Sequence, residues 1–312
     1  ATIAGVTTFN NLTVNSGTTL RTLTNADIRL GGTFTKTGTF ITGAVHSFFR
    51  YTGSNQTVVV PDGAQQAYHN LIITGTGAIF PSSLNINGDL TTNAAVDFTG
   101  KTINITGQDN QTQVIGGTVS PVFNNLVINN NSGLTNLAAS ITVGGTLTLT
   151  SGRINIQGYN LTLGASAVAG SFSSTTMIEA DGAGVVRRPY TGTGSYTFPI
   201  GEGLDTTVYS PITVNVTSGT FSSAYVAVNM KDVKHPSNNS ADNYLTHYWN
   251  VTQTGITGAV ATITTTYEAI DIVGAVGNIS AAQLNGTFNF ATNPWVKFGA
   301  LSGGTLTAAN AT

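Results

Sequence analysis

The 312-residue chain contains no cysteine, which excludes disulfide bonds, thiolate metal sites and cysteine nucleophiles. Charged residues are scarce, at 8% of the chain against roughly 25% in ordinary globular proteins. With 11 Lys and Arg and a net charge of −2, the sequence argues against a nucleic-acid partner, because a phosphate-binding surface needs clustered basic residues. No apolar run approaches the roughly 18 to 20 residues that a membrane-spanning helix needs.

Strong helix formers are also few, and apolar residues do not recur with the helical period of 3.6. The chain is rich instead in Thr, Asn, β-branched residues and Gly, of which there are 37. Alternation of apolar and polar residues is widespread. In "NLTVN", Leu12 and Val14 face one side of a predicted strand while Thr13 and Asn15 face the other. The sequence therefore predicts an all-β protein.

One phrase occurs three times. "FNNLTVNSG" at 9–17 returns as "YHNLIITGTG" at 68–77 and as "FNNLVINNNSG" at 123–133, at intervals of about 59 and 55 residues. Asn11, Asn70 and Asn125 hold the same place in the three copies. Two roles compete for them: left-handed corners between strands, where Asn is tolerated, or amide groups displayed to a ligand. We favour the corner, because the following strand needs one.

A second phrase follows the first at a near-constant distance, as "IRLGGTFT" at 28–35, "LNINGDLT" at 84–91 and "ITVGGTLT" at 141–148. It aligns Gly32, Gly88 and Gly145, which predicts a positive φ or a tight corner there. A third echo aligns Gln56 with Gln111. The repeats predict these inward-facing residues: Leu12, Val14, Ile28, Leu30, Leu71, Ile73, Leu84, Ile86, Leu126, Ile128, Ile141 and Val143.

A unit of about 56 residues suits three coils of a parallel β-helix with roughly 18 to 20 residues each, in which stacking buries the apolar faces. Antiparallel hairpins forming stacked sandwiches are the alternative, because short strands with frequent turns fit both folds. From about Ser171 the repeats end and longer alternating strands begin, which include both tryptophans. We therefore predict a β-helix-like region over 1–170 and an antiparallel β-sandwich over 171–312.

The C-terminal region resembles modules of the large secreted cell-surface adhesin and gliding-type proteins of the Bacteroidetes, which are type IX secretion substrates. The resemblance rests on "GVVRRPY", on "YTFPIGEG" at 196–203 and on "YLTHYWNVT" at 244–252, and the upstream repeats look like those that precede such modules. It implies an extracellular, cell-surface location and adhesive, display or filament roles. The missing initiator Met is read as a processed or excised N-terminus. No sorting domain follows Thr312, so the export signal is read as removed or never present.

Catalytic residues are not assigned, and we do not expect an enzyme. Polysaccharide lyases and hydrolases with β-helix folds need acidic or basic groups that converge beside a sugar. The aspartates of the repeat region are scattered, and a lone Asp at a turn usually hydrogen-bonds locally. These aspartates are Asp27, Asp62, Asp89, Asp97 and Asp109.

No metal site or cofactor is assigned either. The four histidines show no metal-ligand spacing, and His69 stands where other repeats have Asn10 and Asn124, so we interpret it as a surface variant; the others are His46, His235 and His247. Two acidic pairs could offer oxygens to Ca²⁺, which takes six to eight ligands. Neither has a DxDxD-type loop, so we interpret Glu202 with Asp205, and Glu268 with Asp271, as ordinary solvated carboxylates.

Glycans enter as possible partners in two ways. Four aromatic residues would bind glycans if exposed in a row and would form core if buried, namely Tyr244, Tyr248, Trp249 and Trp295. Sequons for N-linked sugar are numerous, and "DTT" at 205–207 matches an O-linked pattern of the Bacteroidetes family that would place sugar on Thr206. The sequons begin at Asn11, Asn55, Asn104, Asn110, Asn160, Asn215, Asn250 and Asn278.

These observations predict an extracellular structural or adhesive protein in which the coils form a rod and the sandwich a docking surface. An uncapped solenoid end favours strand pairing, so we expect another module or a second copy to cover it, giving head-to-tail assembly into a filament or surface layer. The alternative is a carbohydrate-binding or polysaccharide-degrading β-helix protein.

Overall fold

The computed structural model describes residues 1–42, 45–107, 112–166, 168–203, 206–301 and 303–312. This part of the chain contains β-strands and two short 3₁₀ helices but no α-helix. It forms two compact units, the N-terminal unit Ala1–Ser171 and the C-terminal unit Phe172–Thr312. Four residues named above lie outside the described ranges: Asp109, Asn110, Gln111 and Asp205.

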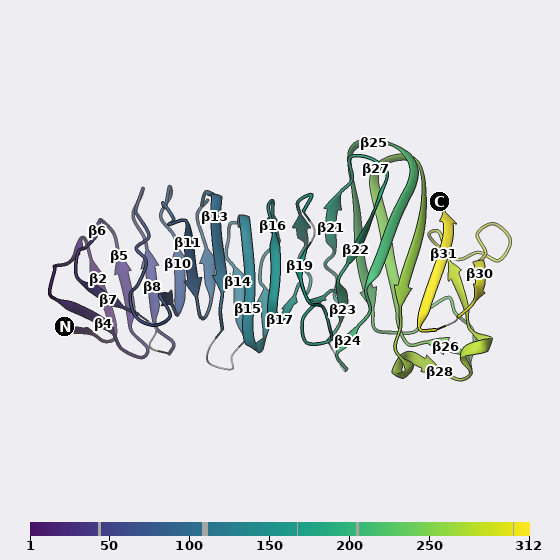
Figure 1. Cartoon of the computed structure of the whole chain (residues 1–312), viewed down its shortest axis with the longest axis horizontal. Helices are drawn as coiled ribbons and strands as arrows, with labels where there is room; N and C mark the ends of the chain where they lie inside the picture. The colour runs from purple at the N-terminus through teal and green to yellow at the C-terminus, as the bar shows by residue number, and fades with distance from the viewer. Residues whose placement is uncertain (43–44, 108–111, 167, 204–205, 302) are drawn as a thin grey trace. The chain divides into compact units, whose positions relative to one another are not determined.

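The N-terminal unit is a parallel β-solenoid of about nine turns, and the prediction of a β-helix is confirmed for this region (Figure 1). Strands of successive coils pair in parallel, and β13 (Phe98–Ile105), β15 (Val122–Leu137) and β17 (Leu147–Asn155) turn corners and so pair in more than one ladder. The first ladder holds β2 (Val6–Phe9), β5 (Asp27–Leu30), β8 (Phe48–Tyr51), β10 (Asn70–Ile73), β12 (Leu90–Thr92) and β14 (Gln113–Gly116). A second joins the starts of β13 and β15 to β16 (Ile141–Val143) and β18 (Leu161–Leu163). A third joins β9 (Ala67–Tyr68), β11 (Ser83–Ile86) and β19 (Ala169–Gly170) through β13, β15 and β17. In the first coils, β3 (Leu12–Val14) pairs with β6 (Phe34–Lys36), and β1 (Thr2–Ile3), β4 (Thr19–Thr22) and β7 (Thr39–Ile41) form a separate three-stranded sheet.

The core runs through the middle of the coils. Ile28, Phe49 and Leu71 occupy successive places in the first ladder, and Leu90 and Ile115 continue the column. All are buried, as are all twelve residues that the repeats predicted to face inward. Burying each such side chain contributes about 1.5 to 3 kcal/mol. No single coil could cover these groups, so stacking holds the unit together.

The predicted coil length was too short. Partners in adjacent coils lie between 18 residues apart, as Ala67 and Asn85 do, and 25 apart, as Leu90 and Ile115 do. Along the first ladder, Asp27, Phe48 and Asn70 follow one another at 21 and 22 residues. The sequence repeat therefore spans between two and three coils instead of three. Its copies fall on three different corners: between β2 and β3, between β9 and β10, and inside β15.

One hydrogen bond recurs at all three corners and explains the repeated asparagines. Oδ1 of Asn11 accepts a hydrogen bond from the backbone N–H of Thr33 at 2.8 Å, one coil further on. Asn70 accepts one from the N–H of Asp89 at 2.8 Å in the same way, and Asn125 accepts one from the N–H of Thr146 at 3.0 Å. Each asparagine thus bonds the residue that follows the glycine of the second phrase, so the two phrases are the two halves of one contact.

The predicted left-handed backbone at these corners is wrong. None of the three asparagines has a positive φ, and neither do Gly32, Gly88 or Gly145. The glycines serve close approach: a Cβ on Gly32 would lie 2.3 Å from Oδ1 of Asn11, and one on Gly145 would lie 2.5 Å from Oδ1 of Asn125. The tight corner, the second of the two readings, is what the glycine provides.

Removing one of these amides should weaken the solenoid by about 1 kcal/mol, since a buried backbone donor loses its acceptor. We expect Asn125→Ala to show this loss in urea unfolding followed by circular dichroism. Asn15→Ala is the matched control, because the Asn15 side chain is exposed in the same unit. Equal stabilities for the two variants would contradict the assigned role of the Asn125 amide.

A column of glycines brings three backbones into close contact on another corner. A Cβ on Gly53 would lie 1.8 Å from the carbonyl oxygen of Gly31, and a Cβ on Gly75 would lie 1.7 Å from that of Gly53. A Cβ on Gly31 would meet nothing closer than 3.8 Å. Within this column, only Gly31 therefore has room for a side chain.

An aromatic cluster fills the coils around Phe49. Its ring lies 5.9 Å from that of Phe34, 5.6 Å from that of Phe40 and 5.4 Å from that of Tyr68, centroid to centroid. Phe49 is 2% exposed. Residues from several consecutive coils thus pack against the ring of Phe49.

The C-terminal unit is built on a long antiparallel hairpin, β25 (Ile212–Lys231) with β27 (Tyr248–Thr266) (Figure 1). β21 (Val186–Pro189) and β22 (Gly194–Phe198) pair with the two ends of β25, and β31 (Thr305–Ala311) pairs with β27. The remaining elements are β20 (Ile178–Glu179), β23 (Ile200–Glu202), β24 (Val208–Tyr209), β26 (Tyr244–Leu245), η1 (Ala269–Asp271), β28 (Ile272–Val273), η2 (Val276–Asn278), β29 (Ser280–Gln283) and β30 (Val296–Ala300).

A small core lies beside this hairpin. Tyr267, Ile279, Ala281 and Leu301 are buried together, with Trp249 and others packed against them. β26 pairs with β28 and β29 pairs with β30, both antiparallel. The unit is therefore mostly antiparallel, with β20 and β23 as a parallel pair, and the predicted two-sheet sandwich stays a prediction.

Candidate functional site

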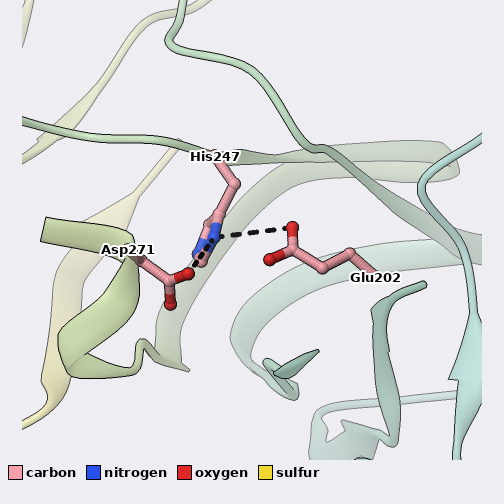
Figure 2. A group of neighbouring side chains, drawn as sticks. All are labelled: Glu202, His247 and Asp271. Carbon is pink, nitrogen blue, oxygen red and sulfur yellow. Dashed lines mark ion pairs between the residues drawn. The ribbon is translucent and has the colours of Figure 1, made fainter. Parts of the chain in front are cut away.

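A group of three buried ionisable side chains lies in the C-terminal unit (Figure 2). Glu202 ends β23, His247 lies directly before β27, and Asp271 ends η1. Within the described ranges, this is the one place where three side chains of metal-ligating type have their ligand atoms within 4.8 Å of one another. The group is called the Glu–His–Asp cluster below.

The cluster is closed to solvent. The side chains of His247, Glu202 and Asp271 are 0%, 4% and 2% exposed. Nδ1 of His247 lies 3.5 Å from Oδ1 of Asp271 and 3.7 Å from Oε2 of Glu202. Neither contact has hydrogen-bond geometry, so both imidazole nitrogens and Oε2 of Glu202 are buried without a hydrogen-bond partner. Such atoms are costly unless something satisfies them.

Burial and charge act against each other on the titration of this cluster. Burial lowers the pKa of His247, but the carboxylates of Asp271 and Glu202 outweigh it and raise that pKa to about 9. Burial raises the pKa of Glu202, and although His247 opposes this, Asp232 and Asp271 add to the rise. In the absence of a bound cation, His247 is therefore an imidazolium at neutral pH, held between carboxylates.

Neighbouring groups fix the orientation of the cluster. The backbone N–H of Glu268 donates to Oδ2 of Asp271 at 2.7 Å, which turns Oδ1 towards His247. The N–H of Thr246 donates to the carbonyl of Asp271 at 2.9 Å. The ring of Trp249 meets that of His247 edge to face, with centroids 4.6 Å apart. The three side chains are thus held before anything binds.

What the cluster can do follows from its chemistry and its burial. One imidazole and two carboxylates form a ligand set for a transition-metal dication. The same groups could act as general acid and base, but a polysaccharide needs access to them and the cluster is buried. The arrangement therefore suits a structural role better than catalysis.

The interpretation of the acidic pairs as solvated carboxylates was wrong for Glu202 and Asp271. Each of the two predicted pairs supplies one member to the cluster, while Glu268 is exposed. The sequence shows no metal-ligand spacing between His247 and the other histidines. The three residues are separated by 45 and 24 positions, so no local motif could have joined them. The apolar setting of "LTHYW" is the only local signal that His247 would be buried.

The four aspartates of the repeat region that the structure describes each have hydrogen-bonding or ion-pair partners, as Asp27 and Asp62 illustrate. Asp27 pairs with Arg29 at 3.0 Å and with Arg50 at 2.6 Å. Asp62 pairs with Lys36 at 2.8 Å. Asp27 thus has the expected local partner in Arg29 and a second partner one coil away, whereas Asp62 bonds the adjacent coil, so the expectation of a local bond was wrong for Asp62.

The other two described aspartates also have simple partners. Asp89 accepts from the N–H of Val114 at 2.8 Å, again one coil away, and burial raises its pKa. Asp97 accepts from the N–H of Thr99 at 2.8 Å, which is the predicted local bond. All four therefore have an evident structural use.

The remaining histidines lie elsewhere. His69 is 6% exposed, so its interpretation as a surface variant was wrong. Its ring lies 5.6 Å from that of His46, which is exposed. His235 is in the C-terminal unit and meets Tyr248 and Trp295 edge to face. Its Nδ1 accepts from the N–H of Ser237.

The four aromatics proposed for glycans are all partly buried, so they are neither a row of exposed rings nor fully enclosed. Trp249 packs against the core and donates its indole N–H to the carbonyl of Ser210 at 3.1 Å. Tyr248, Trp249 and Trp295 line a cavity of about 530 Å³ between the hairpin and the strands that follow it. Tyr244 lies under the ammonium group of Lys234.

Most sequons have their asparagine at least partly accessible. Thr206 is exposed, but the preceding Asp205 is outside the described residues. The exposed or partly exposed asparagines are Asn11, Asn55, Asn104, Asn160, Asn215, Asn250 and Asn278.

No helix in the described residues is long and apolar enough to cross a membrane. In comparisons with known proteins, no family model, no curated protein and no solved structure matches this chain.

Proposed function

We propose that this chain is an extracellular structural or adhesive surface protein whose solenoid acts as a spacer. The observation that carries the proposal is the ladder of stacked coils around one continuous apolar core. Each coil is hydrogen-bonded to its neighbours along the axis, which makes a solenoid resist bending and stretching. A spacer needs that property more than a recognition pocket.

The outer faces of the coils support the same role. Their polar positions repeat in register: Thr13 pairs with Thr35, Thr142 pairs with Thr162, and Nδ2 of Asn104 donates to Oδ1 of Asn85 at 2.9 Å. Such ladders of hydroxyl and amide groups stabilise stacked strands without charge. A surface of this kind is suited to hydrogen-bonded contacts with sugars and other polar surfaces.

The proposal includes end-to-end association of the solenoid. Among the residues that the structure describes, β1, β2 and β3 pair on one side only, with β4, β5 and β6. Free edges of parallel strands accept further strands. A neighbouring module or a second copy would then continue the ladders, and the assembly would form a filament or surface layer. The location at the surface of a Bacteroidetes cell and the type IX route belong to the same proposal.

Negative-stain electron microscopy of the purified chain at several concentrations, beside the native cell surface, tests the assembly. We expect filaments that lengthen with concentration and have an axial repeat of one subunit. Dispersed particles at every concentration, with no filaments on the cell, would refute self-assembly.

The cavity of the C-terminal unit supports a second candidate function, glycan binding. Trp295 and Tyr248 line it and are partly exposed, and aromatic faces of this kind bind sugar rings. Binding on a glycan array that Trp295→Ala abolishes would support this function. An array without signal for the wild-type chain would exclude it for the glycans displayed.

A further inference from the structure

Three buried polar atoms of the Glu–His–Asp cluster have no hydrogen-bond partner. Nδ1 and Nε2 of His247 and Oε2 of Glu202 are buried without hydrogen bonds, although side chains at less than 5% exposure normally find a partner. The ring is held by Trp249 and the carboxylate of Asp271 by Glu268. The His247 ring and the Asp271 carboxylate are thus held with their ligand atoms close to a common point, where a metal ion could lie.

The separations suit a metal ion at that point. Zn²⁺ binds imidazole nitrogen and carboxylate oxygen at about 2.0 to 2.2 Å in a tetrahedral site, which places ligand atoms about 3.4 Å apart. Nδ1 of His247 is 3.5 Å from Oδ1 of Asp271 and 3.7 Å from Oε2 of Glu202. Carboxylate rotation would close the remaining separation, which is within 4.8 Å.

The charge of the ligand set suits a divalent cation. A dication with a neutral imidazole and two carboxylates sums to zero. Buried charge is costly when it is not balanced, so the neutral arrangement is preferred.

We propose that Glu202, His247 and Asp271 bind one transition-metal dication of the Zn²⁺ class. The imidazole disfavours Ca²⁺, which takes oxygen ligands. The ligands come from β23, from η1 and from the segment before β27, so the ion would link three separate parts of the C-terminal unit. His247 also borders the cavity of the C-terminal unit. The site is independent of the proposed surface function.

The experiment uses the full chain with any affinity tag removed, because a histidine tag would itself bind metal. The protein is stripped with a chelator and titrated separately with Zn²⁺, Co²⁺ and Ca²⁺ by calorimetry and visible absorption. We expect one equivalent of Zn²⁺, a visible Co²⁺ band, a higher melting temperature with Zn²⁺ and no comparable response to Ca²⁺. Absence of Zn²⁺ and Co²⁺ binding to the folded wild-type chain would overturn the proposal.

Variants locate the site. His247→Gln and Asp271→Asn should each lower Zn²⁺ affinity by more than about 100-fold, since even groups outside the first coordination sphere commonly cost 10- to 100-fold. His235→Gln is the matched control, because it removes another histidine of the same unit that lies outside the cluster. Unchanged affinity in both cluster variants would overturn the proposal.

A spectrum of the wild-type protein covers the case in which a variant fails to fold. X-ray absorption of the Zn²⁺-loaded chain should show one imidazole and otherwise oxygen ligands. Two or more imidazoles would place the ion elsewhere, for example near His46 and His69, and would overturn the assignment.

Discussion

Gly75→Ala is expected to destabilise the N-terminal unit by about 3 kcal/mol or more, the upper end of the range for overpacking. The new methyl group would lie 1.7 Å from the carbonyl oxygen of Gly53. That oxygen belongs to the backbone of the adjacent coil, so relief requires separation of two coils and the loss of strand pairing. Urea unfolding monitored by circular dichroism measures the change.

Gly31→Ala is the matched control in the same column, since its nearest neighbour would be 3.8 Å away. We expect its stability to differ from wild type by less than about 0.5 kcal/mol, as for ordinary surface substitutions. A Gly75→Ala protein as stable as Gly31→Ala would show that the coils approach each other less closely than described.

Phe49→Ala should cost about 3 to 5 kcal/mol, because it removes a buried ring and leaves a cavity that rigid neighbours cannot fill. The rings of Phe34, Phe40 and Tyr68 all rest on Phe49. Coils contact only their neighbours, so a weak coil separates those before it from those after it. We therefore expect a lower midpoint and also a broader urea transition, which near-ultraviolet circular dichroism would follow.

The control for this change is Phe290→Ala, since the Phe290 side chain is 87% exposed. Its removal should leave the midpoint and the width of the transition unaltered. Equal effects of the two substitutions would mean that the aromatic cluster does not carry the stability of these coils.

The sequence predicted the strands of the solenoid well because their determinants are local. Alternation in "NLTVN" assigned Leu12 and Val14 to the core, and both are buried. The interval between the sequence repeats is correct, but the prediction that one repeat forms three coils was wrong. Coil length depends on the register of partners such as Leu90 and Ile115, which no local pattern specifies.

The corners were predicted in place, and for the glycines the tight corner was one of two alternatives. The left-handed backbone expected of the asparagines was wrong, since Asn125 and Gly145 meet across two adjacent coils. For the Glu–His–Asp cluster even the place was not predicted, since its members lie in three segments of the sequence. In the sequence, its members belong to two separate acidic pairs and to an isolated histidine, His247.

Each of the three repeated asparagines has the glycine that it approaches within the same copy of the sequence repeat, as Asn11 and Gly32, Asn70 and Gly88, and Asn125 and Gly145 show. A gene segment encoding one copy therefore carries both halves of the contact. Tandem duplication or loss of such a segment by recombination would change the number of coils without requiring a compensating mutation elsewhere. The length of the solenoid could then change while the chemistry of its corners stays the same.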